Sequence, residues 1–375
     1  MTHAPITRLA AACLLALLCA SPTTTAAFPS SLPDSLRSEA FKPTVKIGGQ
    51  FFISYEDGRV GGAPYSHFFI NRGYINVRAE VTPWLSGRIT PDIAVDREGD
   101  GEGDLELRLK YCYMQAELPE LAVLTSPSVE FGLVGRPWLE FEQKVNLYRV
   151  QGSMFVERAD ILNSADFGAT FSALLGGSMP EEYQRDVSSY APGRYGSIAI
   201  GLYNGGGYHA IEHNLNKSLE YRLSLRPLHA LIPGLQLTYA GAVGKGNVEK
   251  QVDWNMHIAY LSMEHRAFTV AGTWFVGEGN AKGKLLDTDG TPRDQSGWSA
   301  FADVRIPGTP LSVFGRYDHY VWDNDPSEWE ENTLIAGLTW HVNRKNKLLL
   351  DYERVSDADG EELSHALKLS AELAF

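Results

Sequence analysis

Apolar and polar residues alternate with a period of two along much of this chain, and this pattern limits its fold more than any other feature. The pattern is clearest in residues 367–375. The apolar members of that run are Leu367, Leu369, Ala371, Leu373 and Phe375. Because successive side chains of a β-strand point to opposite faces, the run predicts a strand with one apolar and one polar surface.

The same alternation recurs upstream, in runs at 45–53, 74–81, 105–112, 219–226, 253–260 and 334–353. Most runs have about the 9–11 residues that a tilted membrane strand needs. If the alternation of the run 105–112 is followed to its end, Tyr111 lies on the apolar face of the predicted strand and Cys112 on the polar face. Aromatic rings near the ends of apolar faces suit the headgroup level of a bilayer. The aromatic residues expected to face lipid are Tyr239, Trp254, Tyr260, Trp274, Trp298, Trp340 and Tyr352.

Connections between these runs alternate in length, as in membrane barrels, which have short periplasmic turns and longer outer loops. The short set is Thr82–Trp84, Glu264–Arg266, Pro307–Pro310 and Asn343–Asn346. The long set is Glu56–Ser66, Arg97–Asp104, Gly277–Asp294, Val321–Glu331 and Ser356–Glu362. The pattern predicts an all-β fold, a transmembrane antiparallel β-barrel of about 16 strands with both termini on the periplasmic side.

The N-terminal residues have the layout of a secretory signal, with one Arg, a short apolar core and a stretch of small residues before a cleavage site near Ala26 or Ala27. We therefore expect a cleavable signal peptide (1–27), a periplasmic N-terminal segment (28–40) and an outer-membrane β-barrel (41–375). Two of the three cysteines leave with the signal, so that Cys112 remains and no disulfide framework can form within one chain.

The formal net charge of -13 argues against a nucleic-acid binder, which needs basic surface to neutralise phosphates. The chain has no Gly-x-Ser-x-Gly elbow, no His-Glu-x-x-His zinc motif and no P-loop. We therefore expect neither enzymatic activity nor a cofactor or metal site. The acidic run Arg97–Asp104 lacks the spacing of an EF-hand, so we interpret it as a solvated loop.

Several short stretches resemble the phosphate-selective porin O and P family, and they are spread over roughly residues 41–375. They are Asn71–Val77, Arg88–Ile93, Leu109–Met114, Asn204–Tyr208, Gly315–Asp318 and Leu348–Arg354. A terminal strand that ends on Phe375 also resembles the assembly signal of bacterial outer-membrane barrels. The resemblance implies a homotrimeric porin among outer-membrane lipids and lipopolysaccharide. Its water-filled channel would pass small hydrophilic solutes by diffusion, with a preference for phosphate or other small anions.

The resemblance also implies that the third outer loop folds inward to narrow the lumen, and we assign this constriction loop to Pro137–Asn163. Its candidate functional residues are Glu140, Glu142, Lys144, Arg149 and Arg158. By strand phase, six cations on neighbouring strands form one basic wall of the lumen, namely Arg72, Arg78, Arg88, Arg108, Lys110 and Arg136. Such a wall attracts anions, because a low-dielectric pore concentrates the field of its lining charges.

Acidic residues on the same strands weaken this prediction, because cross-strand ion pairs cancel much of a basic field. They are Glu80, Asp92, Asp96, Glu106 and Glu130. The pattern therefore leaves selective anion passage and weakly selective passage of small solutes both open. Two other hypotheses are a soluble secreted β-sheet binding protein, whose aromatic residues form a core between two sheets, and a closed barrel without a channel.

Overall fold

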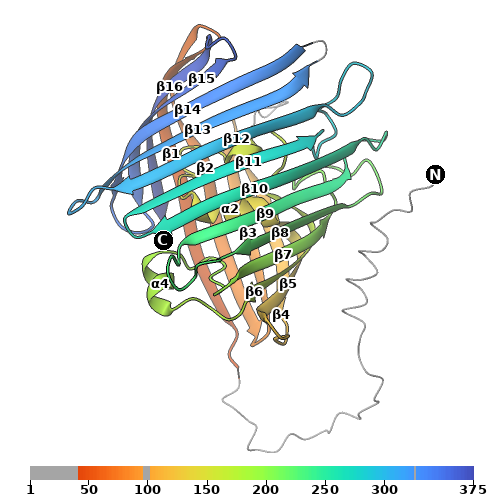
Figure 1. Cartoon of the computed structure of the whole chain (residues 1–375), viewed down its shortest axis with the longest axis vertical. Helices are drawn as coiled ribbons and strands as arrows, with labels where there is room; N and C mark the ends of the chain where they lie inside the picture. The colour runs from red at the N-terminus through yellow and green to blue at the C-terminus, as the bar shows by residue number, and fades with distance from the viewer. Residues whose placement is uncertain (1–40, 96–101, 325–326) are drawn as a thin grey trace, which may run out of the picture.

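The computed structural model of the chain describes residues 41–95, 102–324 and 327–375. Sixteen antiparallel strands form one closed barrel, which confirms the predicted fold class (Figure 1). The predicted signal peptide and N-terminal segment lie outside the described residues, as do Asp96 and residues 97–101 of the acidic run. The strands are β1 (Thr44–Val60), β2 (Ala63–Thr82), β3 (Leu85–Val95), β4 (Leu105–Glu117), β5 (Leu124–Gly135), β6 (Ala165–Leu175), β7 (Gly196–Tyr203), β8 (Ser218–Leu225), β9 (Leu235–Lys245), β10 (Asp253–His265), β11 (Phe268–Glu278), β12 (Asp294–Arg305), β13 (Leu311–Asn324), β14 (Ser327–His341), β15 (Lys347–Asp357) and β16 (Glu362–Ala374).

The last strand closes the barrel against the first. Gln50 of β1 lies opposite Ala374 of β16, and beyond this pair Gly49 and Phe375 exchange two backbone hydrogen bonds of 3.1 Å. A Cβ atom on Gly49 would come within 2.6 Å of the Phe375 ring, so a residue without a side chain is needed here. The sheet therefore has no free edge, and β1 begins at the barrel end where β16 finishes.

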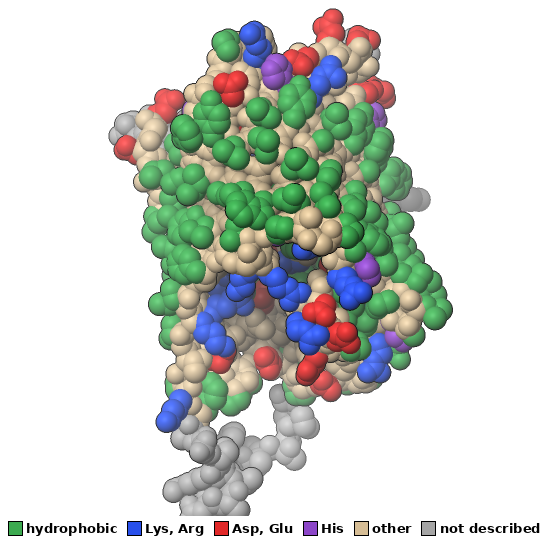
Figure 2. Space-filling model, turned by 90° about the vertical axis from the view of Figure 1, so that its left-hand side faces the viewer, with side chains coloured by type: hydrophobic (Ala, Val, Ile, Leu, Met, Phe, Trp, Pro, Cys, Tyr) green, Lys and Arg blue, Asp and Glu red, His purple; other side chains and the backbone are tan. Residues whose placement is uncertain are grey.

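Apolar side chains cover the outside of the barrel. On β16, Leu369 is 54% exposed, whereas Ser370 on the opposite face is 1% exposed. Figure 2 shows hydrophobic side chains over most of the surface of one side of the barrel. A soluble two-sheet protein buries such leucines between its sheets, so this arrangement contradicts that alternative and supports a barrel that crosses the outer membrane. None of the described helices is long and apolar enough to cross a membrane.

The phase predicted for β10 is wrong. Trp254 and Tyr260, expected to face lipid, are 1% and 4% exposed and point into the barrel. The other five aromatic residues predicted on the lipid side are exposed on the outer surface. The reason is that a helix inside the barrel presents apolar side chains to β10, so this wall of the lumen is apolar as well. His257 then lies on the outer face, where its Nδ1 atom is 2.9 Å from the Tyr239 hydroxyl.

A second correction concerns β4. Tyr111 and Cys112 exchange the predicted faces, since Tyr111 is buried in the lumen and Cys112 is exposed. The register between β3 and β4 shifts here: Thr90 lies opposite Tyr111, and Pro91 lies opposite Leu109. Because proline has no backbone N–H for the ladder, an irregularity beside Pro91 is expected. Lys110 is the extra residue of this bulge, and it points inward together with Tyr111.

The connections differ from prediction at two outer loops. Glu56–Ser66 belongs mostly to β1 and β2, which run up to a two-residue turn of Gly61 and Gly62 with φ angles of 55° and 82°. Glycine adopts such angles without strain, so the hairpin can be long and tightly closed. Val321–Glu331 likewise belongs mostly to β13 and β14, with residues 325–326 outside the described set. The long connection after β11 agrees with the prediction.

The core of the molecule lies inside the barrel. Between β5 and β6 the chain folds inward and forms α2 (Pro137–Val145) and α3 (Phe155–Arg158). Figure 1 shows α2 within the ring of strands. A further helix, α4 (Glu181–Asp186), lies in the connection between β6 and β7. We call residues 136–164 the inward segment, residues 176–195 the periplasmic segment, and the end with the chain termini and short turns the periplasmic end.

Candidate functional site: the lumen beside the inward segment

A buried ion pair fixes the start of the inward segment. Pro137 occupies the first turn of α2, where its missing N–H leaves no bond unmade. Arg136 precedes it and is 0% exposed; its Nη2 atom lies 2.6 Å from Asp166 Oδ2 and 3.0 Å from the carbonyl oxygen of Gly205. Its Nε atom is 3.3 Å from Glu220 Oε1 on β8. Arg136 therefore ties the inward segment to the barrel wall and does not line the pore as predicted.

The middle of the inward segment bonds to the arc of the barrel wall that runs from β13 to β2. Arg72 of β2 donates to the Ser153 hydroxyl at 3.0 Å, and Arg316 of β13 donates to the Ser153 carbonyl oxygen at 2.7 Å. Arg158 of α3 donates to Glu353 of β15 at 2.7 Å. Predicted cations of the wall and of the segment are thus used to hold the segment in place.

Apolar contacts fix the segment against β10, β11 and neighbouring strands. The Trp138 and Tyr260 rings meet edge to face with centroids 5.0 Å apart, and Phe155 meets Phe275 in the same way at 5.7 Å. Such pairs contribute beyond the area that they bury. They explain the apolar inner surface of β10. One half of the lumen is consequently a packed core, and water is left to the other half.

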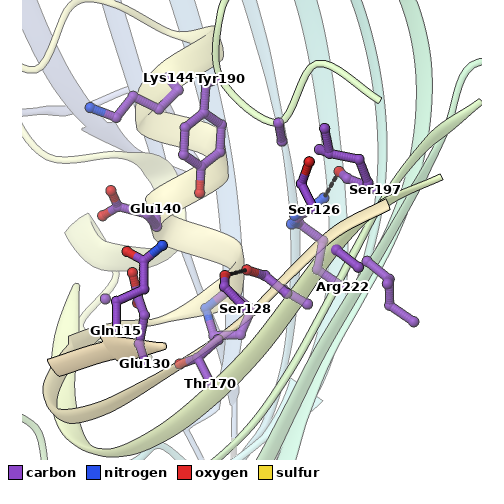
Figure 3. Close-up of a pocket in the computed structure, with 18 of the residues that line it drawn as sticks. Gln115, Ser126, Ser128, Glu130, Glu140, Lys144, Thr170, Tyr190, Ser197 and Arg222 are labelled. Carbon is purple, nitrogen blue, oxygen red and sulfur yellow. Dashed lines mark hydrogen bonds between the residues drawn. The ribbon is translucent and has the colours of Figure 1, made fainter. Parts of the chain in front are cut away.

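On that other side, a water-accessible cavity lies between the inward segment and strands β2 to β8 (Figure 3). We call it the pore cavity. Figure 3 shows Glu140 and Lys144 of α2, Gln115 and Glu130 of the wall, and Tyr190 of the periplasmic segment around the same space. Its remaining charged lining residues are Arg78, Arg88 and Arg222.

Two of the six predicted wall cations, Arg78 and Arg88, line the pore cavity. Arg78 is exposed and forms no ion pair with any residue that the structure describes. Arg88 donates to Asn76 at 2.7 Å and lies over the Tyr111 ring. Both guanidinium groups are therefore available to oxygen atoms of a passing anion.

The other predicted wall cations serve the structure. Lys110 is 2% exposed, with Nζ 3.0 Å from Ser164 Oγ at the end of the inward segment. Arg108 lies 3.5 Å from Asp92 of β3, in the cross-strand pairing considered above, and 3.4 Å from Glu106 of its own strand. Together with Arg72 and Arg136, these residues account for four of the six positions. Of the six predicted wall cations, two thus line the pore cavity, and four contact the inward segment or neighbouring carboxylates.

The candidate residues of the inward segment also divide. Glu140 and Lys144 line the pore cavity, and Lys144 forms no ion pair within the described part of the chain. Glu142, on the opposite side of α2, is buried. Arg149 forms a two-pronged ion pair with Glu157. Arg158 and Glu142 are therefore internal to the segment and its contacts, whereas Arg149 also lines a hollow at the periplasmic end, described below.

The charges around α2 shift the pKa values of its carboxyl groups. Burial opposes ionisation of Glu140, but Lys144 and Arg88 outweigh it and lower its pKa, so Glu140 is charged at neutral pH. Burial raises the pKa of Glu142 to about 8, despite Arg316 nearby. Two carboxyl groups on one short helix therefore differ in charge at neutral pH.

Strand phase did not predict a cluster of cations at the periplasmic end. Lys46, Lys144, Arg344, Lys345 and Lys347 surround a hollow that is continuous with Arg78 and Arg88; we call it the basic mouth. Figure 2 shows Lys and Arg side chains gathered around such a hollow in the lower part of the barrel. Glu80 pairs with Lys46 and Glu372 with Lys347. Two of these residues, Arg344 and Lys345, lie in the turn before β15, and the other three come from β1, α2 and the first position of β15.

Comparisons with known proteins find the same fold at low sequence identity. No family model matches the chain, and no curated protein matches its sequence. Among solved structures, a loop-deletion form of OmpT, an outer membrane protein of Vibrio cholerae, is similar at 9% identity over 89% of this chain and 99% of that one, with a TM-score of 0.60. An anion-selective porin from Comamonas acidovorans has 10% identity, covers 89% and 100%, and gives 0.59. The outer membrane channel DcaP of Acinetobacter baumannii has 10% identity, covers 90% and 99%, and gives 0.58.

Proposed function

We propose that the protein is a porin of the bacterial outer membrane, whose water-filled channel lets small hydrophilic solutes diffuse passively and favours anions. The observation that carries this proposal is the pore cavity beside α2, which opens into the basic mouth and holds Arg78 and Lys144, two cations without an ion-pair partner among the described residues. Charges at a low-dielectric wall concentrate counter-ions at the entrance of a pore.

The charge balance of the pore cavity limits the expected preference. Glu130 and Glu140 share it with Arg78, Arg88 and Lys144, and Arg108 is neutralised by Asp92 and Glu106. We therefore expect a moderate preference for small anions such as phosphate or chloride, and no exclusive phosphate site. Membership of the phosphate-selective O and P family remains part of the proposal and is supported by the sequence resemblance.

Two further features belong to the same proposal. The polar residues of the pore cavity are distributed over several strands of the wall, which supports transport over catalysis. A homotrimer is supported by the resemblance and by the trimer form in which OmpT of Vibrio cholerae is also known, a protein 9% identical to this chain with a TM-score of 0.54.

Recording in planar lipid bilayers tests the proposal. The purified full-length protein should produce discrete conductance steps, and in a potassium chloride gradient the reversal potential should have the sign of chloride preference. A protein that is folded, as shown by its heat-modifiable migration on a gel, but that yields no steps is not a channel. Conductance with a reversal potential of the opposite sign would retain the channel and reject the anion preference.

A further inference from the structure

The periplasmic segment is longer than the other connections at its end of the barrel, which have two to nine residues. It runs from Gly176 to Tyr195 between β6 and β7, whereas only Arg266 and Ala267 join β10 to β11. Membrane barrels keep their periplasmic turns short. A connection of this length with its own helix is a departure that needs a structural explanation.

Internal contacts give the segment a fixed shape. Gly176 and Gly177, with φ angles of 71° and 84°, turn the chain at its start. The N–H of Met179 then bonds the carbonyl oxygen of Pro192 at 2.7 Å. Arg226, beyond the end of β8, donates to the hydroxyl of Tyr183 at 2.9 Å. The segment is thus bonded to itself and to the barrel wall.

This shape brings Tyr190 to the inward segment. The rings of Tyr190 and Phe141 of α2 have centroids 6.3 Å apart. Tyr190 and Ala191 line the pore cavity beside Glu140 and Lys144, and Figure 3 shows the Tyr190 ring next to α2. One segment thus enters from each end of the barrel, and the two meet at this contact.

The opposite side of the periplasmic segment lines a second cleft. Gln184, Arg185 and Val187 face it, and Arg266, Arg305 and Arg344 lie across it. Its inner wall includes Tyr148, which stacks on Phe314 with centroids 4.1 Å apart and contacts Phe301. These three rings belong to a buried cluster. This cleft therefore ends on packed side chains, whereas the pore cavity on the other side of the segment continues along the polar wall.

We propose that the periplasmic segment forms a second constriction, in which Tyr190 limits the size of solutes and directs them past Arg78, Arg88 and Lys144. The inference rests on the channel function proposed above and assigns its size limit to a periplasmic residue as well as to the inward segment. The phenol ring occupies space between α2 and β6 to β7, so its volume sets the free cross-section at this point.

Substitution of Tyr190 in both directions tests this role. Y190A should raise the single-channel conductance and admit larger neutral sugars in a liposome-swelling assay, and Y190W should lower both. Y190F should resemble wild type, because the ring and not the hydroxyl limits passage. Tyr195 belongs to the same segment but is 45% exposed and packs against His229, so Y195A is the matched control and should leave both readouts unchanged.

The outcomes separate this inference from the proposed function. If the wild-type protein conducts but neither Y190A nor Y190W differs from Y195A, the size limit lies elsewhere and the inference is overturned, while the channel stands. If the wild-type protein does not conduct, the proposed function itself fails. Opposite shifts of conductance in Y190A and Y190W, with Y195A unchanged, support the second constriction.

Discussion

Arg136 and Asp166 form an ion pair of 2.6 Å in which both side chains are 0% exposed. Asp166 also accepts a hydrogen bond of 2.7 Å from the N–H of Gly205. The pair thus joins the start of the inward segment, the start of β6 and the outer loop after β7. A charge that loses its partner at such a site has no water to replace it.

Breaking this ion pair should destabilise the inward segment and its contacts with the barrel wall. We expect R136A to lower the free energy of unfolding by about 3–5 kcal/mol, because it leaves Asp166 buried and unpaired. The measurement is the urea midpoint of the heat-modifiable gel shift. R185A is the control, since its pair with Asp186 is largely exposed to water and should contribute little to stability. Equal effects of both substitutions would contradict the anchoring role.

The anion preference should depend on the cations that reach water. The combined substitution of Arg78, Arg88 and Lys144 by alanine should shift the reversal potential in a salt gradient toward cation preference, because it removes positive field from the pore cavity. The control removes Arg59, which is exposed, and Arg354, which is partly exposed, both at the other end of the barrel. An identical shift in the control would mean that overall charge, and not the pore lining, determines the preference.

Glu142 should make stability fall as pH rises. Burial raises its pKa to about 8 in the folded protein, against about 4.3 in an unfolded chain. Between these values the folded state binds the additional proton, so unfolding becomes easier with increasing pH across this window. E142Q should remove this contribution and flatten the dependence of the thermal unfolding temperature between pH 5 and pH 8. A slope that persists in E142Q would assign the effect to other groups.

The reversed phase of β10 can be tested with two tryptophans on adjacent strands. Trp254 is 1% exposed inside the barrel, and Trp274 is 55% exposed on the outer surface. W254A should cost about 3–5 kcal/mol, since it opens a cavity in the packed core, and it should also loosen α2 and increase current noise. W274A should cost much less. Urea titration in detergent measures the loss of unfolding free energy in both variants. A larger loss in W274A than in W254A would indicate that Trp254 faces outward after all.

Cys112 provides a separate test of the bulge in β4. Because it is exposed on the outer face, a charged water-soluble thiol reagent should react with it slowly in intact membranes. A cysteine at Ser128, which lines the pore cavity, should react fast in a C112S background. Rapid reaction of Cys112 itself would place it in the lumen, as strand phase alone predicted.

The sequence alone was sufficient to predict the barrel and its strand count, because alternation and loop length are local signals, whereas the inward segment was predicted from the family resemblance. The inward and outward faces of β10 and part of β4 were predicted wrongly, because contacts with distant residues determine which side chains point into the barrel. Trp254 alternates with polar residues in either orientation, and only its contact with the inward segment selects one. Likewise, the bulge at Lys110 depends on Pro91 of the partner strand.

The same limit applies to the candidate site. Strand phase placed Arg78 and Arg136 in one basic wall, yet one faces water and the other is enclosed by Asp166 and Glu220. Arg136 is buried because its ion-pair partners, which are far away in sequence, enclose it. The alternation along a single strand contains no information about such partners. Tyr190 had a recognisable signal in the length of the connection after β6, which exceeds the turns at that end, but its contact with Phe141 requires coordinates.

The packed half of the lumen, centred on Trp138 and Tyr260, has an evolutionary consequence. In an open tube every inward residue influences both permeation and folding. Here the packed side supplies most of the contacts that stabilise the fold. Substitutions on the opposite side can therefore change which solutes pass with little effect on folding. Lineages carrying this architecture should diversify fastest at Arg78, Arg88 and their neighbours, while the aromatic contacts of the filled side stay fixed.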